Sequence, residues 1–123
     1  MTTILLAIKP EFADKILSAQ KKFEFRRIMP RKPINKIVIY ATRPVGHVVG
    51  TVNVRGIISG AHDDVWKITK NNAGITREFF DSYFCGRNMA FAFDLDNPIK
   101  YNTPKTLSDF GLRVAPQSFI YLD

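Results

Sequence analysis

Short apolar or alternating segments recur along the whole chain, and they constrain its fold more than any other feature. They cover Thr3–Ile8, Lys22–Ile28, Lys36–Thr42, His47–Ser59, Asn88–Leu95, Pro98–Asn102 and Ser118–Leu122. β-Branched and aromatic residues dominate them, most clearly in KIVIYAT at Lys36–Thr42, and this composition is typical of strands. Strands and helices do not alternate regularly, so a doubly wound parallel sheet is not expected.

Helical spacing appears in three places between these segments. Pro10 suits the first position of a helix that follows the first strand and reaches about Ala19. Asp63–Lys70 and Thr76–Phe84 are two further candidates in mid-chain, and Thr106–Phe110 suits a single helical turn. Glycines inside a long strand, as in His47–Ser59, are common where barrels bend. We therefore predict an α+β fold: a small β-barrel of about six strands, with one helix after the first strand and two mid-chain helices.

The chain has 123 residues, which favours one domain over 1–123. A single cysteine, Cys85, excludes an internal disulfide framework, and two histidines are too few for a Cys/His zinc cluster, so we expect no metal and no cofactor. The longest apolar run, Ile4–Ile8, is far short of a membrane span. We expect a cytoplasmic protein, monomeric by default.

The positive charge is concentrated in one window. The chain carries a net +7, and residues 15–43 hold nine basic residues against Glu24 alone, a local +8. A solvated basic face is one interpretation, and a polyanionic partner is the other. Pro30 and Pro33 break the window and leave no amphipathic helix for a membrane surface, so we favour nucleic acid.

The residues with chemical potential lie inside this window, in the segment Lys21–Arg26 (KKFEFR). On a strand, Glu24 and Arg26 project from one face roughly 7 Å apart. A carboxylate between basic groups stays ionised and orients them, so the cluster could bind a phosphate or a base edge. A lysine desolvated in a pocket could also act as a base or nucleophile. Surface ion pairs, a binding site and a catalytic site all remain open from these residues alone.

Three stretches of the chain resemble the ASCH domain of the PUA-like superfamily, in particular its small proteins described as transcriptional regulators. They are Ile4–Arg27, Val38–Gly50 and Pro116–Leu122. Lys21, Glu24 and Arg26 match the family signature G-x-K-x-x-E-x-R, whereas Ala19 replaces the usual glycine. If that position requires a positive φ, Ala19 is strained; otherwise the helix runs one turn further.

The resemblance implies a cleft, lined by this signature, that takes RNA or a single nucleotide. Thr42 and Tyr40 at the end of a strand would join the lining, Gln117 and Ser118 would form a wall, and Lys9 and Arg43 would sit near the mouth. With the neighbouring basic side chains, the expected nucleic-acid-binding residues are Lys9, Lys21, Lys22, Glu24, Arg26, Arg27, Tyr40, Thr42, Arg43, Gln117 and Ser118.

Two functions follow from the resemblance. The first is binding of single-stranded RNA, with a possible regulatory role. The alternative is a hydrolase: a ribonuclease with Lys21 and Glu24 as an acid–base pair, or an N4-acetylcytidine amidohydrolase. In the amidohydrolases a threonine stands at the position of Glu24, and Glu78 is a loose match for their further glutamate. Whether the protein is an enzyme stays open, as does a protein–protein adaptor that uses the Phe-rich helix Thr76–Phe84.

Overall fold

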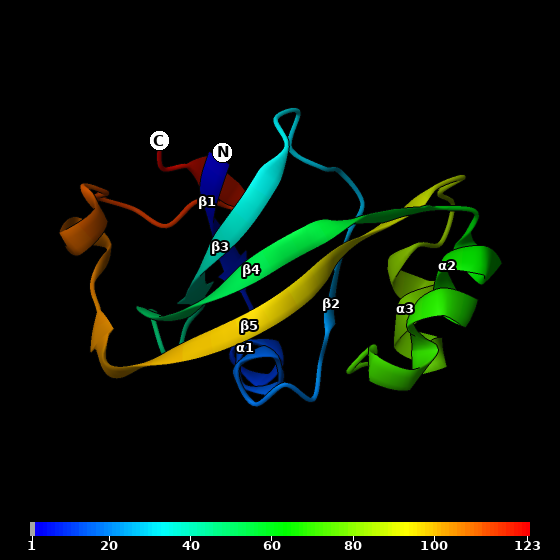
Figure 1. Ribbon diagram of the computed structural model, residues 1–123, viewed down its shortest axis with the longest axis horizontal. Helices are drawn as coiled ribbons and strands as arrows, with labels where there is room; N and C mark the ends of the chain where they lie inside the picture. Colours follow the sequence, from blue (N-terminus) through cyan, green and yellow to red (C-terminus); the bar gives the residue numbers. More distant parts are fainter. Residues whose placement is uncertain (1) are drawn as a thin grey trace.

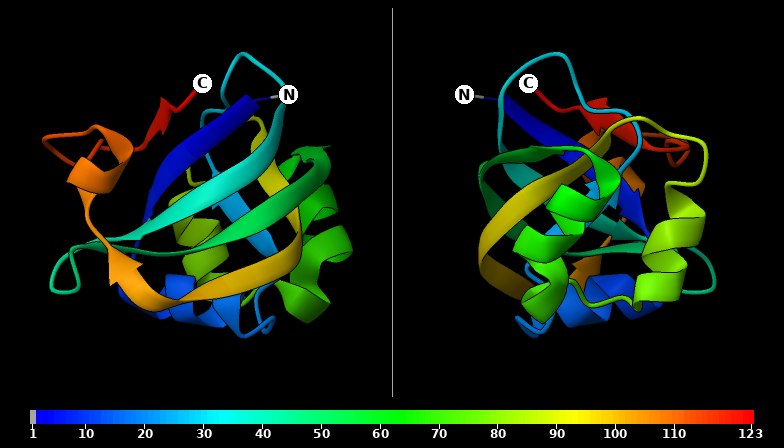
Figure 2. Two further views of the ribbon diagram at one scale, coloured as in Figure 1. Left: turned by 60° about the vertical axis from the view of Figure 1, so that its left-hand side comes forward. Right: turned by 90° about the vertical axis from the view of Figure 1, so that its right-hand side faces the viewer.

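One six-stranded sheet curls on itself and forms the body of the protein (Figures 1 and 2). The computed structural model describes residues 2–123. The sheet has the order β2-β5-β4-β3-β1-β6. β1 and β3 are parallel, and the other neighbouring strands are antiparallel. The strands are β1 (Thr2–Ile8), β2 (Phe23–Arg26), β3 (Ile34–Ala41), β4 (His47–Gly60), β5 (Ala90–Lys105) and β6 (Phe119–Tyr121).

The helices lie at two places around the sheet. α1 (Pro10–Leu17) crosses below the curled sheet, and α2 (His62–Thr69) and α3 (Arg77–Tyr83) pack together beyond the far ends of β4 and β5 (Figure 1). Two 3-10 turns, η1 (Lys70–Asn72) and η2 (Leu107–Phe110), complete the described elements. The predicted α+β barrel, with a helix after the first strand and two in mid-chain, is confirmed. No helix in residues 2–123 has the length and hydropathy to cross a membrane.

Three clusters of apolar side chains hold these elements together. The largest lies between the curled sheet and α1 and includes Ile4, Ile8 and Ile37. The second joins β2 to α2 and α3 through Phe25, Phe80 and other apolar side chains. The third lies on the opposite face of β1 and β3. Side chains of β5 and of the C-terminal segment cover it. Its members are Leu5, Ala7, Val38, Tyr40 and Val48, and the covering side chains include Tyr101, Leu107 and Phe110.

The structure corrects several predicted boundaries. Pro98–Asn102 is no separate strand but part of the continuous β5. The register of β4 and β5 shifts opposite Asn97 and Pro98, so these residues form a bulge in which proline needs no ladder partner. β3 begins at Ile34, two residues before the predicted start at Lys36, because Ile34 already pairs with Thr2 of β1. The strand predicted at Lys22–Ile28 is shorter, since only Phe23–Arg26 pairs with β5.

Gly50 bends β4 as expected from its place inside a long strand. The register with β3 shifts between Ile39 and Tyr40, directly opposite this glycine. A Cβ atom at position 50 would clash with the carbonyl oxygen of Ile99 and with Leu17 of α1. The missing side chain therefore allows β5 and α1 to approach β4 closely, which is the role of glycine at a bend in a closed or curled sheet.

Candidate functional site

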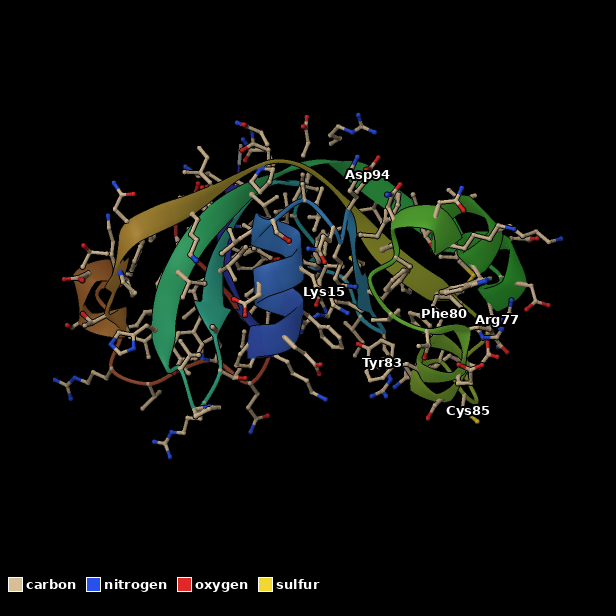
Figure 3. The ribbon with its side chains drawn as sticks, turned by 90° about the horizontal axis from the view of Figure 1, so that it is seen from below. Lys15, Arg77, Phe80, Tyr83, Cys85 and Asp94 are labelled. Carbon is tan, nitrogen blue, oxygen red and sulfur yellow. The ribbon has the colours of Figure 1, made fainter. Side chains whose placement is uncertain are left out.

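Lys21, Glu24 and Arg26 converge on one cavity of about 350 Å³. The cavity lies between the curled sheet, α1 and α3; seen from below, α1 and α3 flank β2 (Figure 3). Its lining comprises Ala7, Lys9, Phe12, Lys21, Glu24, Phe25, Arg26, Thr42, Ile75, Phe79, Tyr83 and Gln117. Glu24 and Lys21 are both almost fully buried, so the interpretation of these charges as surface ion pairs is wrong.

Arg26 connects the two edges of the sheet. Its Nε and Nη2 donate to Oε2 of Glu24 at 3.2 and 2.9 Å, Nη2 also donates to the carbonyl oxygen of Ala7 at 2.8 Å, and Nη1 donates to Oγ of Ser118 at 3.4 Å. A guanidinium has five N–H donors, and four of them have partners here. Arg26 therefore positions Glu24 and bridges β2 to β1 and to Ser118, the residue before β6, and it has little capacity left for a ligand.

Lys21 is a buried amine beside the same carboxylate. Its side chain is 2% exposed, its Nζ donates to the carbonyl oxygen of Ala73 at 2.7 Å, and Oε1 of Glu24 is 3.9 Å away. The Nζ atom also lies 4.8 Å from the centre of the Phe25 ring and 5.3 Å from that of Phe12. Burial lowers the pKa of Lys21 from 10.5 to about 8, because desolvation outweighs the opposing attraction of Glu24.

The turn after α1 directs Lys21 into the cavity. α1 ends at Leu17, and Ala19 has a left-handed backbone with φ of 64°. The backbone N–H groups of Gln20 and Lys21 both donate to the carbonyl oxygen of Lys15, which closes the turn. The position of the signature glycine thus does require a positive φ, and alanine occupies it at a steric cost.

Gly74 provides the space for the Lys21 stem on the other side. It also has a positive φ, and a Cβ atom there would lie 2.5 Å from Cβ and Cγ of Lys21. Lys15 donates from its Nζ to the carbonyl oxygen of Gly74 at 3.3 Å. Lys15, in the last turn of α1, and Lys21, after that helix, therefore both hold the Ala73–Gly74 segment against the barrel. This segment leads into α3.

The apolar wall of the cavity comes from α3 and the segment before it. Ile75, Phe79 and Tyr83 line it, and Phe12 of α1 meets the Phe79 ring edge-on at 5.4 Å. Burial raises the pKa of Tyr83 above its ordinary value. Sequence reasoning missed these residues as parts of the site. The helix predicted at Thr76–Phe84 has more aromatic residues than one helical face can bury. This excess was the signal that could have identified Phe79 and Tyr83.

The remaining predicted residues divide between the cavity, its rim and other surfaces. Thr42 and Gln117 line the cavity, and Lys9 lies at its mouth with its Nζ 5.7 Å from the centre of the Phe79 ring. Arg43 is exposed next to Thr42. Ser118 contacts the cavity through Arg26.

Besides Arg43 and Ser118, three predicted residues lie outside the cavity lining. Arg27 stacks on the outer side of Tyr83, with its guanidinium carbon 4.3 Å from the ring centre. Lys22 is exposed and faces a separate hollow between α1 and β5. Tyr40 is buried in the third apolar cluster, because side chains alternate along β3 and its ring points to the face opposite Ile39. Glu78, the loose match for a further catalytic glutamate, is exposed and also stands outside the lining.

The donor set suits an organic anion better than a metal ion. Within residues 2–123, no group of three or more histidine, cysteine, aspartate or glutamate side chains is placed to hold a metal. The cavity instead presents lysine and arginine cations around a single carboxylate, with aromatic rings opposite. This arrangement can hold a planar, negatively charged ligand between a charged wall and an apolar wall.

A curled sheet with the residues Lys21, Glu24 and Arg26 in a cavity beside it defines a class of small β-barrel proteins. The ASCH domain model matches residues 6–105, and the chain belongs to the ASCH domain family. The family resemblance drawn from the sequence is thereby confirmed, and membership of the PUA-like superfamily is consistent with it.

Relatives share the domain in different contexts. An ASCH domain-containing ribonuclease from Zymomonas mobilis is 36% identical over 90 residues, which are 72% of this chain and 61% of that protein. The crystal structure of ASCH from Zymomonas mobilis is 32% identical with a TM-score of 0.87, and the match covers 98% of this chain and 87% of that one. The large ribosomal subunit protein uL22 of Ureaplasma parvum is 26% identical over 121 residues, 98% of this chain. This chain spans 39% of the length of that uL22 protein.

Proposed function

We propose that this protein binds single-stranded RNA and accommodates one nucleotide in the cavity. The observation that carries the proposal is the two-sided lining: Lys9, Lys21 and Arg26 surround Glu24 on one side, and aromatic rings form the other. The lining thus has a net positive charge and an apolar wall against which a base can stack. Bases that are free of a duplex expose both their faces and their edges to such a site.

The side chains of the cavity differ in what they can offer a ligand. Arg26 is engaged by Glu24, Ala7 and Ser118, so the phosphate contacts are expected from Lys9 of the lining and from the exposed Arg43, which follows Thr42 of the lining. Phe79, 38% exposed, offers its ring to a base. Lys21 and Glu24, a donor and an acceptor side by side, can hydrogen-bond to a base edge.

The named activity of one relative supports RNA as the ligand class. The Zymomonas mobilis protein is called a ribonuclease, and RNA is the polyanion that such a protein must bind. The charge of this chain is consistent with the same ligand, since its net +7 attracts phosphates and releases their counterions.

Ribonuclease activity is the second candidate, and the state of Lys21 favours it. An amine with a pKa of about 8 is partly neutral near physiological pH and can accept a proton. Glu24 lies 3.9 Å from that amine, so the amine could accept the proton of the 2′-hydroxyl of RNA, with the carboxylate stabilising the resulting ammonium, and could then return that proton to the leaving oxygen.

Binding and cleavage are tested with one labelled, mixed-sequence single-stranded RNA. Fluorescence anisotropy at several salt concentrations should give an affinity that falls with salt, by a slope of about −0.7 in log–log terms for each phosphate neutralised. Lys9→Ala/Arg43→Ala should weaken binding roughly tenfold. Lys67→Ala/Lys70→Ala, which removes two exposed lysines of α2 and η1 outside the cavity lining, should not. Absence of binding, or equal losses in both variants, would contradict the proposal.

The same RNA, followed by gel electrophoresis, tests cleavage. Loss of cleavage in a folded Lys21→Met protein that still binds would assign the chemistry to the amine. Intact RNA after prolonged incubation with the wild-type protein would leave binding as the sole function.

A further inference from the structure

The connection between β2 and β3 carries a cluster of positive charge outside the cavity. Residues 27–33, here called the basic loop, contain Arg27, Arg31 and Lys32 and no acidic residue. All three cations are exposed. None of the three lines the cavity, although they belong to the basic window that gives the chain its charge.

One end of the basic loop is attached to the rim of the cavity. Arg27 donates from Nε to the carbonyl oxygen of Tyr83 at 2.8 Å, and its guanidinium lies 4.3 Å above the Tyr83 ring. Tyr83 itself belongs to the cavity lining. The guanidinium of Arg27 is therefore packed on a residue of the cavity lining, and its terminal amino groups have no partner among the hydrogen bonds of Arg27 to Tyr83, so they can make a planar contact to phosphate.

The other end is attached to β6. The hydroxyl oxygen of Tyr121 accepts hydrogen bonds from the backbone N–H groups of Arg31 and Lys32 at 3.1 and 3.3 Å. The Lys32 amine lies 4.9 Å from the centre of the same ring. Asp123, two residues further on, accepts from the backbone N–H of Thr3.

The basic loop runs from Tyr83, in the cavity lining, to Tyr121 in β6. Ser118 contacts Arg26 at the cavity, and Tyr121 is three residues later along the β6 segment. At about 3.3 Å per residue, this separation is roughly 10 Å. A nucleotide strand that leaves the cavity past Tyr83 would meet Arg27, and a strand that continues along β6 to Tyr121 would meet Arg31 and Lys32.

We infer that the basic loop binds the phosphates of the RNA that flank the nucleotide in the cavity. The inference rests on the proposed function and extends it, because it identifies the ligand as a strand longer than one nucleotide. The tyrosine rings beneath Arg27 and Lys32 restrict the two side chains before binding, so less conformational entropy is lost on contact with phosphate. Such contacts position the strand without reading its sequence.

The experiment compares a dinucleotide with a ten-nucleotide RNA of mixed sequence on three proteins, by calorimetry and anisotropy. The proteins are the wild type, Arg31→Ala/Lys32→Ala and the control Lys67→Ala/Lys70→Ala. In the loop variant, affinity for the longer RNA should fall roughly tenfold and the magnitude of its salt slope by about 1.4, while dinucleotide affinity stays unchanged. The control should match the wild type with both ligands, and urea unfolding should show all three equally stable.

The outcomes separate this inference from the function on which it rests. If the wild type binds the longer RNA and the loop variant binds it equally well, the loop is not a contact surface and the cavity proposal stands. If the loop variant loses dinucleotide and longer RNA alike, the loop acts through the cavity and the inference is wrong. If the wild type binds neither ligand, both proposals fall.

Discussion

The buried amine of Lys21 makes the stability of the protein depend on pH in an unusual direction. In the folded protein its pKa is about 8, whereas an unfolded chain restores the ordinary 10.5. Below pH 8 the amine is charged in both states, and folding bears the full cost of burying the charge. Between pH 8 and 10.5 the unfolded state binds more protons than the folded state, so the free energy of unfolding rises with pH.

The difference between the two pKa values corresponds to about 3 kcal/mol when it is fully expressed. Between pH 7 and 9.5 the expected gain is about 2 kcal/mol. Tyr83 acts in the opposite sense. Because burial raises its pKa, the unfolded state loses that proton first, and stability falls above pH 10. Measurements are therefore best limited to pH 9.5 and below.

Urea unfolding at fixed ionic strength, at pH 7 and pH 9.5, tests this for the wild type and Lys21→Met. Other groups titrate in both proteins, so the difference between the two pH dependences isolates Lys21. The wild type should gain about 2 kcal/mol more than the variant. A parallel change in the two proteins would refute the reasoning. If the variant does not fold, direct NMR titration of the Lys21 amine gives the same answer, with a midpoint near 8 expected and one near 10.5 contradicting it.

Three further predictions concern stability, each measured by urea unfolding. Ala19→Gly should stabilise the protein by about 0.5–1 kcal/mol, since glycine has no steric cost at a φ of 64° but loses more backbone entropy; a destabilised variant would contradict the assigned turn. Gly74→Ala should cost about 2 kcal/mol or more, because the new Cβ meets Lys21, whereas the control Gly86→Ala, with a similar φ and open space, should cost only about 1 kcal/mol. Arg26→Ala should cost about 3 kcal/mol by leaving the buried carboxylate of β2 without its principal partner, and a loss below 1 kcal/mol would argue against that pairing.

Local patterns in the sequence were sufficient for much of the fold. The β-branched segment KIVIYAT predicts β3, which is buried along most of its length, and the alternation of aromatic and charged residues around Phe23 and Phe25 predicts β2. Alternation also places Glu24 and Arg26 on one face, and their hydrogen bonds confirm it. It does not show that this face turns inward, since burial of a charged pair depends on how the sheet curls.

Contacts between distant parts of the chain could not be predicted in this way. Lys21 and Lys22 are neighbours, yet one is buried and the other exposed, and the left-handed residue Ala19 sets the direction of the chain between helix and strand. The bond from Lys21 to Ala73 spans 52 residues and brings α3 to the cavity. No local periodicity encodes such a pairing, so the aromatic wall becomes visible only in three dimensions.

The closure of the sheet by the side chain of Arg26 has a consequence for the size of what the protein can hold. Where a backbone ladder joins the first and last strands, the girth of a barrel is fixed by strand number and stagger. Here the guanidinium of Arg26 spans the seam beside the cavity. The width of the cavity at this seam is therefore set by the reach of one hydrogen-bonded side chain and not by strand number and stagger.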